Sequence, residues 1–282
     1  MPRRRYPGPI VDVHTHPMLG ATPILGGAPH TAEDYLKAVR GLPVRHVAGL
    51  TIAFAGRMNE TRAANDAILA LPGSTGGRFF PVCSVHPEDG AEALGEIDRV
   101  AALGARALKL HPNTQRFDVS SPAVHAVVAR ATERGLPILF DAYSPFDPGQ
   151  PGKFVMLAIE QPTARLILAH AHGPHFPDLL VYDTLARYEF WKRNVWIDLS
   201  ATGPLLAGGP FAEQFVWVLR KAGVDRLLFG SDYPLDPPRP AIDAIDRLGF
   251  TRKELERVFY RNAVELFGLE PPVAPRRPKT RR

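Results

Sequence analysis

Short runs of aliphatic and β-branched residues alternate with longer amphipathic stretches about eight times along this chain of 282 residues. No other feature restricts the possible folds as strongly. A strand followed by a helix, repeated many times, implies parallel strands that are joined by helical crossovers. Eight such units in one chain predict a single (β/α)8 barrel, a TIM barrel, rather than an open sheet with a second domain. The strands are expected at residues 10–16, 46–54, 78–86, 106–111, 137–143, 165–172, 195–200 and 226–232.

The residues between these strands carry helix signals. Gly104, Gly135 and Gly223 each follow a helical run, where a left-handed C-terminal residue is favoured. Ser121 and Pro122 are typical of a helix start. Helices are expected at residues 32–40, 60–71, 91–103, 122–134, 153–160, 177–190, 211–222 and 241–248, and an extra C-terminal helix at 252–267.

The basic residues of the chain are concentrated at its two ends. The chain has 34 Lys and Arg against 29 Asp and Glu, a formal net charge of +5. Eight of the cations lie in residues 3–5 and 276–282, which leaves 26 basic against 29 acidic side chains in the rest. We therefore divide the chain into a basic N-terminal arm (1–9), one barrel domain (10–270) and a basic, proline-rich tail (271–282) that is predicted to be disordered.

This charge distribution bears on the class of partner. A domain that binds nucleic acid normally carries its positive charge on the folded surface, so no nucleic acid is expected as a partner. Polyanion binding through the basic ends is the alternative from another functional class. The partner expected here is a small-molecule substrate, and a homodimer is left open.

The sequence offers no sign of a membrane or secreted protein. No run approaches about 18 consecutive apolar residues, so no membrane association is expected. The first ten residues turn to Pro and Gly where a secretory signal would be apolar. Cys83 is the single cysteine, which excludes an intrachain disulfide. The expected location is cytoplasmic.

Histidines and carboxylates concentrate where the predicted strands end. In a (β/α)8 barrel the active site lies at the C-terminal ends of the strands. His14 and His16 are two residues apart on the first strand, so both can approach one point. Two imidazoles and a carboxylate can hold a catalytic divalent ion, and Asp232, from the strand that closes the barrel, is the natural third ligand. The other strand ends carry His86, Lys109, His111, Asp141, Tyr143, His170 and His172.

These strand ends resemble a known family. The stretch V-D-V-H-T-H (11–16) resembles the first-strand signature of the amidohydrolase superfamily, and more narrowly the amidohydrolase-related (amidohydrolase 2) family of metal-dependent hydrolases and decarboxylases. Further stretches are similar to that family in the same order along the chain. They are A-L-K-L-H-P (107–112), G-L-P-I-L-F (135–140), L-I-L-A-H-A-H-G (166–173), F-G-S-D-Y-P (229–234) and Y-R-N-A-V-E-L-F-G-L (260–269).

The resemblance implies roles for individual residues. His14 and His16 would bind the metal, and Asp232 would bind it or act as a base toward water. His170 would bind metal, or polarise the substrate and shuttle a proton. Lys109 takes the position of a lysine that is carbamylated in binuclear relatives.

One position departs from the family pattern. Asp141 stands where the family usually has a histidine ligand at the end of the fifth strand. A carboxylate there can still bind a metal and shifts the preference toward harder ions. The expected cofactor is therefore a divalent ion, Zn²⁺ first, with Mn²⁺ or a metal-free site as the alternatives.

The remaining strand-end residues are candidates for substrate binding. Lys109, His111, Tyr143 and His172 form this group, and each has an alternative structural role. Lys109 can be a salt-bridged barrel residue, His111 can support a loop, and His172 can brace one. The same uncertainty applies to Asp232, which could cap the following helix.

The residues allow two reactions on this scaffold. The first is hydrolysis of an amide, lactone or ester of a small organic substrate by a metal-activated water, with Asp232 as base and His170 as polarising group. The second is non-oxidative decarboxylation of the aminocarboxymuconate-semialdehyde decarboxylase type. A barrel that has lost catalysis is a third interpretation, which Asp141 allows.

Overall fold

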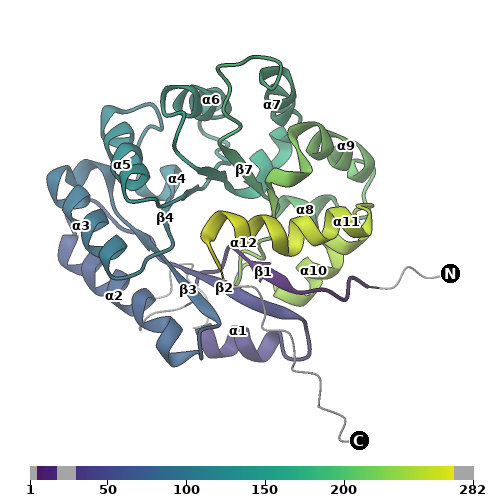
Figure 1. Cartoon of the computed structure of the whole chain (residues 1–282), viewed down its shortest axis with the longest axis horizontal. Helices are drawn as coiled ribbons and strands as arrows, with labels where there is room; N and C mark the ends of the chain where they lie inside the picture. Colours follow the sequence, from purple (N-terminus) through teal and green to yellow (C-terminus); the bar gives the residue numbers. More distant parts are fainter. Residues whose placement is uncertain (1–4, 18–29, 270–282) are drawn as a thin grey trace, which may run out of the picture.

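The computed structural model describes residues 5–17 and 30–269. Eight parallel strands form one sheet in sequence order, and the helices surround it (Figure 1). The single (β/α)8 fold is confirmed. The strands are β1 (Ile10–Asp12), β2 (Val44–Leu50), β3 (Phe79–Ser84), β4 (Ala107–Leu110), β5 (Ile138–Phe140), β6 (Leu166–Leu168), β7 (Val195–Asp198) and β8 (Leu227–Leu228).

Helices connect successive strands. Between β1 and β4 these are α1 (Ala32–Ala38), α2 (Met58–Ser74), the 3₁₀ helix η1 (Pro87–Asp89) and α3 (Ala91–Ala102). Between β4 and β7 they are α4 (Pro112–Gln115), α5 (Pro122–Glu133), α6 (Gln150–Glu160), η2 (Ala169–Leu179) and α7 (Leu180–Leu185). The last part has α8 (Thr202–Leu206), α9 (Ala212–Ala222), η3 (Val224–Arg226), α10 (Pro238–Arg247), α11 (Arg252–Glu256), the π-helical η4 (Arg257–Arg261) and α12 (Asn262–Phe267).

Backbone hydrogen bonds beyond the ends of β1 and β8 close the barrel. The amide of Val13 donates to the carbonyl of Phe229 at 2.9 Å, and the amide of Asp232 donates to the carbonyl of His14 at 2.8 Å. Thr15 and Tyr233 form a further parallel bridge. This closure brings the first and last strand ends together, which places Asp232 next to His14 and His16.

The predicted strands are real but shorter than expected, because their polar ends leave the regular ladder. The largest difference follows β6. The expected strand 165–172 stops at Leu168, and His170, Ala171 and His172 adopt positive φ angles of 62°, 45° and 60°. The helix expected at 177–190 is correspondingly short, since α7 covers only Leu180–Leu185.

The barrel interior has an apolar layer toward the N-terminal ends of the strands and a polar layer toward their C-terminal ends. Ala107, Leu139 and Trp196 belong to or pack against the inner cluster, with Val11 and Val13 of the first strand. Two residues further along, on the same face of each strand, lie Lys109, Asp141 and Asp198. Residues of the extra C-terminal helix fill the opposite opening, where the rings of Phe267 and Phe80 lie 5.1 Å apart.

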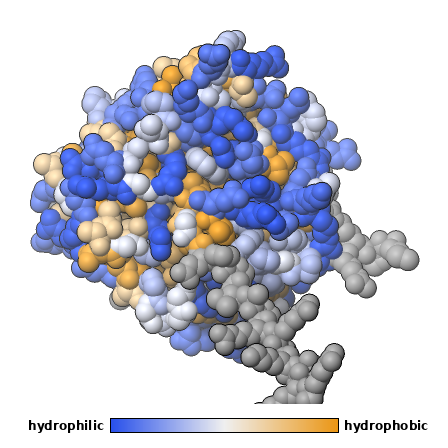
Figure 2. All heavy atoms as spheres, viewed as in Figure 1, coloured by the Kyte–Doolittle hydropathy of each residue, from blue (hydrophilic) through white to orange (hydrophobic). Residues whose placement is uncertain are grey.

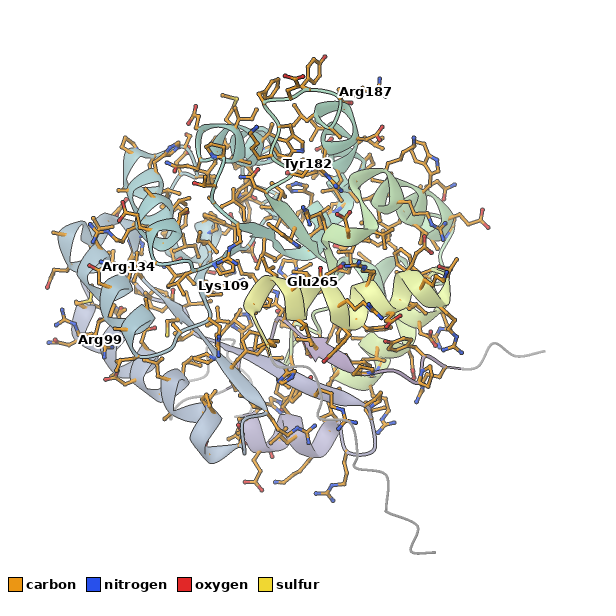
Figure 3. The ribbon with its side chains drawn as sticks, viewed as in Figure 1. Arg99, Lys109, Arg134, Tyr182, Arg187 and Glu265 are labelled. Carbon is orange, nitrogen blue, oxygen red and sulfur yellow. The ribbon has the colours of Figure 1, made fainter. Side chains whose placement is uncertain are left out.

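The charged surface and the charged interior are distinct. Arg134 and Arg187 lie at the periphery in Figure 3, whereas Lys109 lies within the ring of helices. On the face shown in Figure 2, hydrophilic residues cover much of the surface and hydrophobic ones are scattered between them.

No helix in the described ranges is both long and apolar enough to cross a membrane. The predicted tail 271–282 and residues 1–4 of the N-terminal arm lie outside the described residues.

Candidate metal centre and active site

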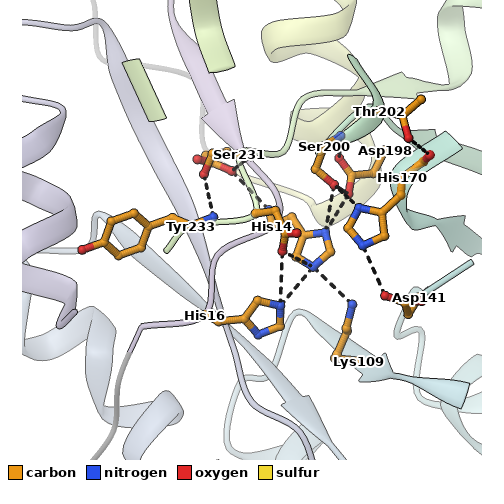
Figure 4. Close-up of polar contacts among 12 residues, drawn as sticks. His14, His16, Lys109, Asp141, His170, Asp198, Ser200, Thr202, Ser231 and Tyr233 are labelled. Carbon is orange, nitrogen blue, oxygen red and sulfur yellow. Dashed lines mark hydrogen bonds and ion pairs between the residues drawn. The ribbon is translucent and has the colours of Figure 1, made fainter. Parts of the chain in front are cut away.

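His14 and His16 lie side by side at the C-terminal end of the barrel (Figure 4). Asp232 lies close enough to both to form a metal-binding group with them. The two Nε2 atoms lie 3.1 Å apart. Oδ1 of Asp232 lies 3.5 Å from Nε2 of His14 and 3.7 Å from Nε2 of His16. All three side chains are buried, so three donor atoms face one point inside the protein.

A buried carboxylate, Asp198 at the end of β7, orients His14. Oδ2 of Asp198 lies 2.7 Å from Nδ1 of His14. A carboxylate accepts the proton on Nδ1, which leaves the lone pair of Nε2 free to face Asp232. The pair therefore sets the tautomer that a metal ligand requires.

Ser200 joins this pair to His170. Its Oγ lies 2.6 Å from Oδ2 of Asp198, 3.2 Å from Nδ1 of His14 and 3.0 Å from Nδ1 of His170. His14, His170 and Asp198 are also close enough to form a second metal-binding group. The Ser200 hydroxyl is within hydrogen-bond distance of all three side chains and joins them into one network.

His170 and Asp141 form an ion pair beside the centre. Nε2 of His170 lies 3.2 Å from Oδ2 of Asp141. Burial lowers the pKa of His170, but the hydrogen bond and the charge of Asp141 outweigh it and raise that pKa to about 9. The same oxygen of Asp141 lies 3.3 Å from Nε2 of His111. His170 is therefore a proton donor at neutral pH, and Asp141 interacts with two imidazoles.

Left-handed backbone at three consecutive residues points His170 inward. Such φ values are costly for residues with a Cβ and persist where the surroundings fix them. Thr202 supplies part of that restraint, because its hydroxyl donates to the carbonyl of His170 at 2.6 Å.

The end of β8 is held by Asp12. Its Oδ1 accepts from the amide of Ser231 at 2.9 Å, and its Oδ2 accepts from the hydroxyl of Tyr35 at 2.7 Å. Gly230 precedes this contact, and a Cβ there would lie 2.7 Å from Cβ of His14. Only glycine lets the β8 backbone approach His14 this closely, so the next residue but one, Asp232, reaches the centre.

Burial controls the charges of the three candidate ligands. It lowers the pKa of His14 and His16 well below the ordinary value, and neighbouring cations act in the same direction. Burial raises the pKa of Asp232 to about 6. The two imidazoles are therefore neutral at pH 7, the form that binds a metal.

The arrangement fits a divalent ion. Two neutral imidazole nitrogens and one carboxylate oxygen are a common donor set for a catalytic ion. The buried ring of His16 has no hydrogen-bond partner at Nδ1 in the described part of the chain, so its contacts lie on the Nε2 side. A cation bound there would restrain that ring. His14, His16 and Asp232 are the residues that would hold it.

Two connected cavities lie over these side chains. The inner one, about 90 Å³, includes His14, His16 and Asp232 in its lining. The outer one, about 800 Å³, adds Tyr143 and further residues. Four residues line both: His111, Asp141, His170 and Asp232. The inner cavity has room for an ion and water, and the outer one for a small organic molecule.

The other predicted site residues lie in different surroundings. Tyr143 and His111 line the outer cavity. Lys109 lines neither cavity, and its Nζ lies 3.2 Å from Nε2 of His14 inside the barrel. His172 is also absent from both linings, and its Nδ1 lies 3.0 Å from the carbonyl of Ala142, so it braces the loop after β5. Asp232 is not a helix cap, since α10 follows Pro237.

The sequence alone did not identify Asp198 and Ser200 as site residues. A signal exists, because D-L-S ends the predicted strand 195–200 with two polar residues on one face. Asp12 was also missed, although it stands within V-D-V-H-T-H. A single buried carboxylate in an aliphatic strand carries no local sign of the partners it will meet.

Known proteins resemble this chain in sequence profile and in fold. A protein-family profile described as amidohydrolase matches residues 11–269. No protein with a curated description matches. Similar solved structures include a 5-carboxyvanillate decarboxylase from Novosphingobium aromaticivorans, complexed with manganese (16% identity, TM-score 0.68, covering 94% of this chain and 96% of that one). A second is a 2,6-dihydroxybenzoate decarboxylase from Rhizobium (14% identity, TM-score 0.70, covering 93% of this chain and 99% of that one). A third is a probable 2-pyrone-4,6-dicarboxylic acid hydrolase from Acinetobacter baumannii (18% identity, TM-score 0.67, covering 92% of this chain and 99% of that one).

Proposed function

The chain belongs to the amidohydrolase family, and we propose that it is a metal-dependent hydrolase that cleaves an ester, lactone or amide bond of a small organic substrate. The observation that carries the proposal is the position of Asp232. Its carboxylate is within 3.7 Å of both histidine Nε2 atoms and lines both cavities. A base in this position lies beside the candidate metal ligands and within reach of a substrate in the outer cavity.

A divalent ion, Zn²⁺ or Mn²⁺, would lower the pKa of a bound water toward about 7 and polarise a carbonyl. Asp232 accepts the proton of the attacking water. His170, held protonated by Asp141, donates a hydrogen bond to the carbonyl oxygen or a proton to the leaving group. His14 keeps its position through Asp198.

The second candidate reaction is decarboxylation. It is favoured by the same protonated His170, which could protonate a ring carbon, and by the decarboxylases that make up most of the similar structures with a named reaction. In this reaction no water enters the product, and carbon dioxide leaves.

Isotope and gas measurements separate the two reactions. The zinc- and manganese-loaded proteins would be incubated with neutral lactones and esters and with hydroxybenzoates in ¹⁸O-labelled water. Hydrolysis places one ¹⁸O atom in the carboxylic acid product and releases no carbon dioxide. Asp232→Asn is expected to lower kcat by about 100-fold or more, and Asp183→Asn, on α7, is the matched control. Carbon dioxide release without labelling of the product would exclude the hydrolase proposal.

A further inference from the structure

The outer cavity has mostly apolar walls. Three prolines, Pro145, Pro174 and Pro204, line it together with Tyr143 and Leu205. The ring of Tyr143 lies against Gly173, where a Cβ would approach a ring carbon to 2.7 Å, so this glycine gives the ring its space. The proline and tyrosine rings have few rotamers, so they offer rigid apolar surfaces to a flat, apolar body.

His170 is the one cationic side chain of these walls in the described residues. In the described ranges, no Lys or Arg lines either cavity. Lys109 is enclosed inside the barrel, and Arg57 is exposed, with NH1 3.3 Å from Oε2 of Glu60. Among the residues that line the outer cavity but not the inner one, Asp236 is the only acidic or basic residue of the described chain. The charged side chain that the outer cavity adds to the four shared residues is therefore a carboxylate.

Two uncharged polar side chains of the wall, Asn113 and Thr202, are already hydrogen-bonded. Nδ2 of Asn113 donates to the carbonyl of Tyr143 at 2.8 Å, and the hydroxyl of Thr202 donates to the carbonyl of His170. An anionic group bound beside Asp236 would lose its hydration, be repelled by that carboxylate and find few donors in return.

We propose that the substrate is uncharged: a cyclic ester or amide with a flat apolar body, whose carbonyl lies beside His170 and whose remaining part bears no carboxylate. This inference rests on the proposed hydrolase function. It distinguishes the chain from any enzyme of this fold that binds a dicarboxylate.

The binding test uses two stable cyclic amides of the same shape, 3,4-dihydro-2-quinolinone and its 6-carboxylate. Calorimetric titration of the metal-free and zinc-loaded proteins measures the affinity for each. The neutral amide is expected to bind at least tenfold more tightly in both forms. Equal or tighter binding of the carboxylate, or binding of neither compound, would overturn the inference.

Variants test the role of Asp236. Asp236→Asn is expected to improve the affinity for the carboxylate at least threefold, and Asp236→Arg to reverse the preference. Asp183→Asn removes the same charge far from the cavity and should keep the wild-type ratio. An unchanged ratio in Asp236→Arg would contradict the assignment.

Turnover of the corresponding lactones, 3,4-dihydrocoumarin and its 6-carboxylate, is measured separately. Selective binding of the neutral amide without lactone hydrolysis would contradict the proposed hydrolase function. It would still support the inference that the cavity binds an uncharged molecule. Hydrolysis of both lactones at equal kcat/KM would contradict only the inference that the substrate is uncharged.

Discussion

Asp198 and His14 are 184 residues apart in the sequence, and their side chains meet at 2.7 Å inside the barrel. At most 1% of either side chain is exposed to solvent. A contact of this kind fixes the ring of His14, a candidate metal ligand, before any ion binds.

Asp198→Asn is expected to weaken zinc binding by about 10- to 100-fold, because the amide no longer holds the proton on Nδ1 of His14 as a carboxylate does. Titration against a competing chelator measures the affinity. Asp225→Asn, at the surface beside Arg193, should have the wild-type affinity. Wild-type affinity in Asp198→Asn would remove this carboxylate from the positioning of His14.

His14→Ala and His16→Ala should each abolish metal binding, since each removes one of three convergent donors. Elemental analysis of protein purified without chelator is expected to find about one divalent ion per wild-type chain. His125→Ala, on α5, serves as the control. If the wild type and both variants contain equal and negligible metal, the proposed centre does not exist.

Phe267→Ala should lower the free energy of unfolding by about 3–4 kcal/mol, because it leaves a cavity against Phe80 at the closed end of the barrel. Denaturant titration measures the change. Leu103→Ala, at an exposed side chain, should change it by less than about 0.5 kcal/mol. A comparable small loss in both variants would show that α12 does not seal the barrel.

Glu254→Gln tests the ion pair with Arg220, whose Nε lies 2.8 Å from Oε1 of Glu254. Arg220 lowers the pKa of Glu254 to about 2. A carboxyl group with a lowered pKa stabilises the fold above its unfolded pKa of about 4.3, and that stabilisation is lost as the pH falls toward 2.

The expected loss in Glu254→Gln at pH 7 is under about 1 kcal/mol, because Arg220 is partly exposed and solvent screens the pair. The loss should vanish near pH 2. Glutamine can still complete the capping box with Thr251, so the charge alone is removed. Thermal unfolding from pH 2 to pH 7 measures the difference, and a loss that does not depend on pH would exclude the ion pair as its source.

Much of the fold could be predicted from local pattern. Each β/α unit has its own hydrophobic periodicity and helix signals, so the eight strands and the extra C-terminal helix could be located from the sequence. The bounds were less accurate after β6, where the expected strand continued through His172 but the observed strand ends at Leu168. The contacts of His170 with Thr202 and Ser200 decide the left-handed backbone there, and neither residue is near it in sequence.

The sequence by itself determined the barrel and the strand ends at which chemistry is expected, because strand period and chain order fix which residues lie at the C-terminal face. Only the tertiary structure decided which of those side chains contact one another. It joined Asp141 to His170 and His111, enclosed Lys109, turned His172 away from the cavity and brought Asp198 to His14. Such pairings depend on barrel closure and side-chain packing between segments up to 184 residues apart, which no local pattern encodes.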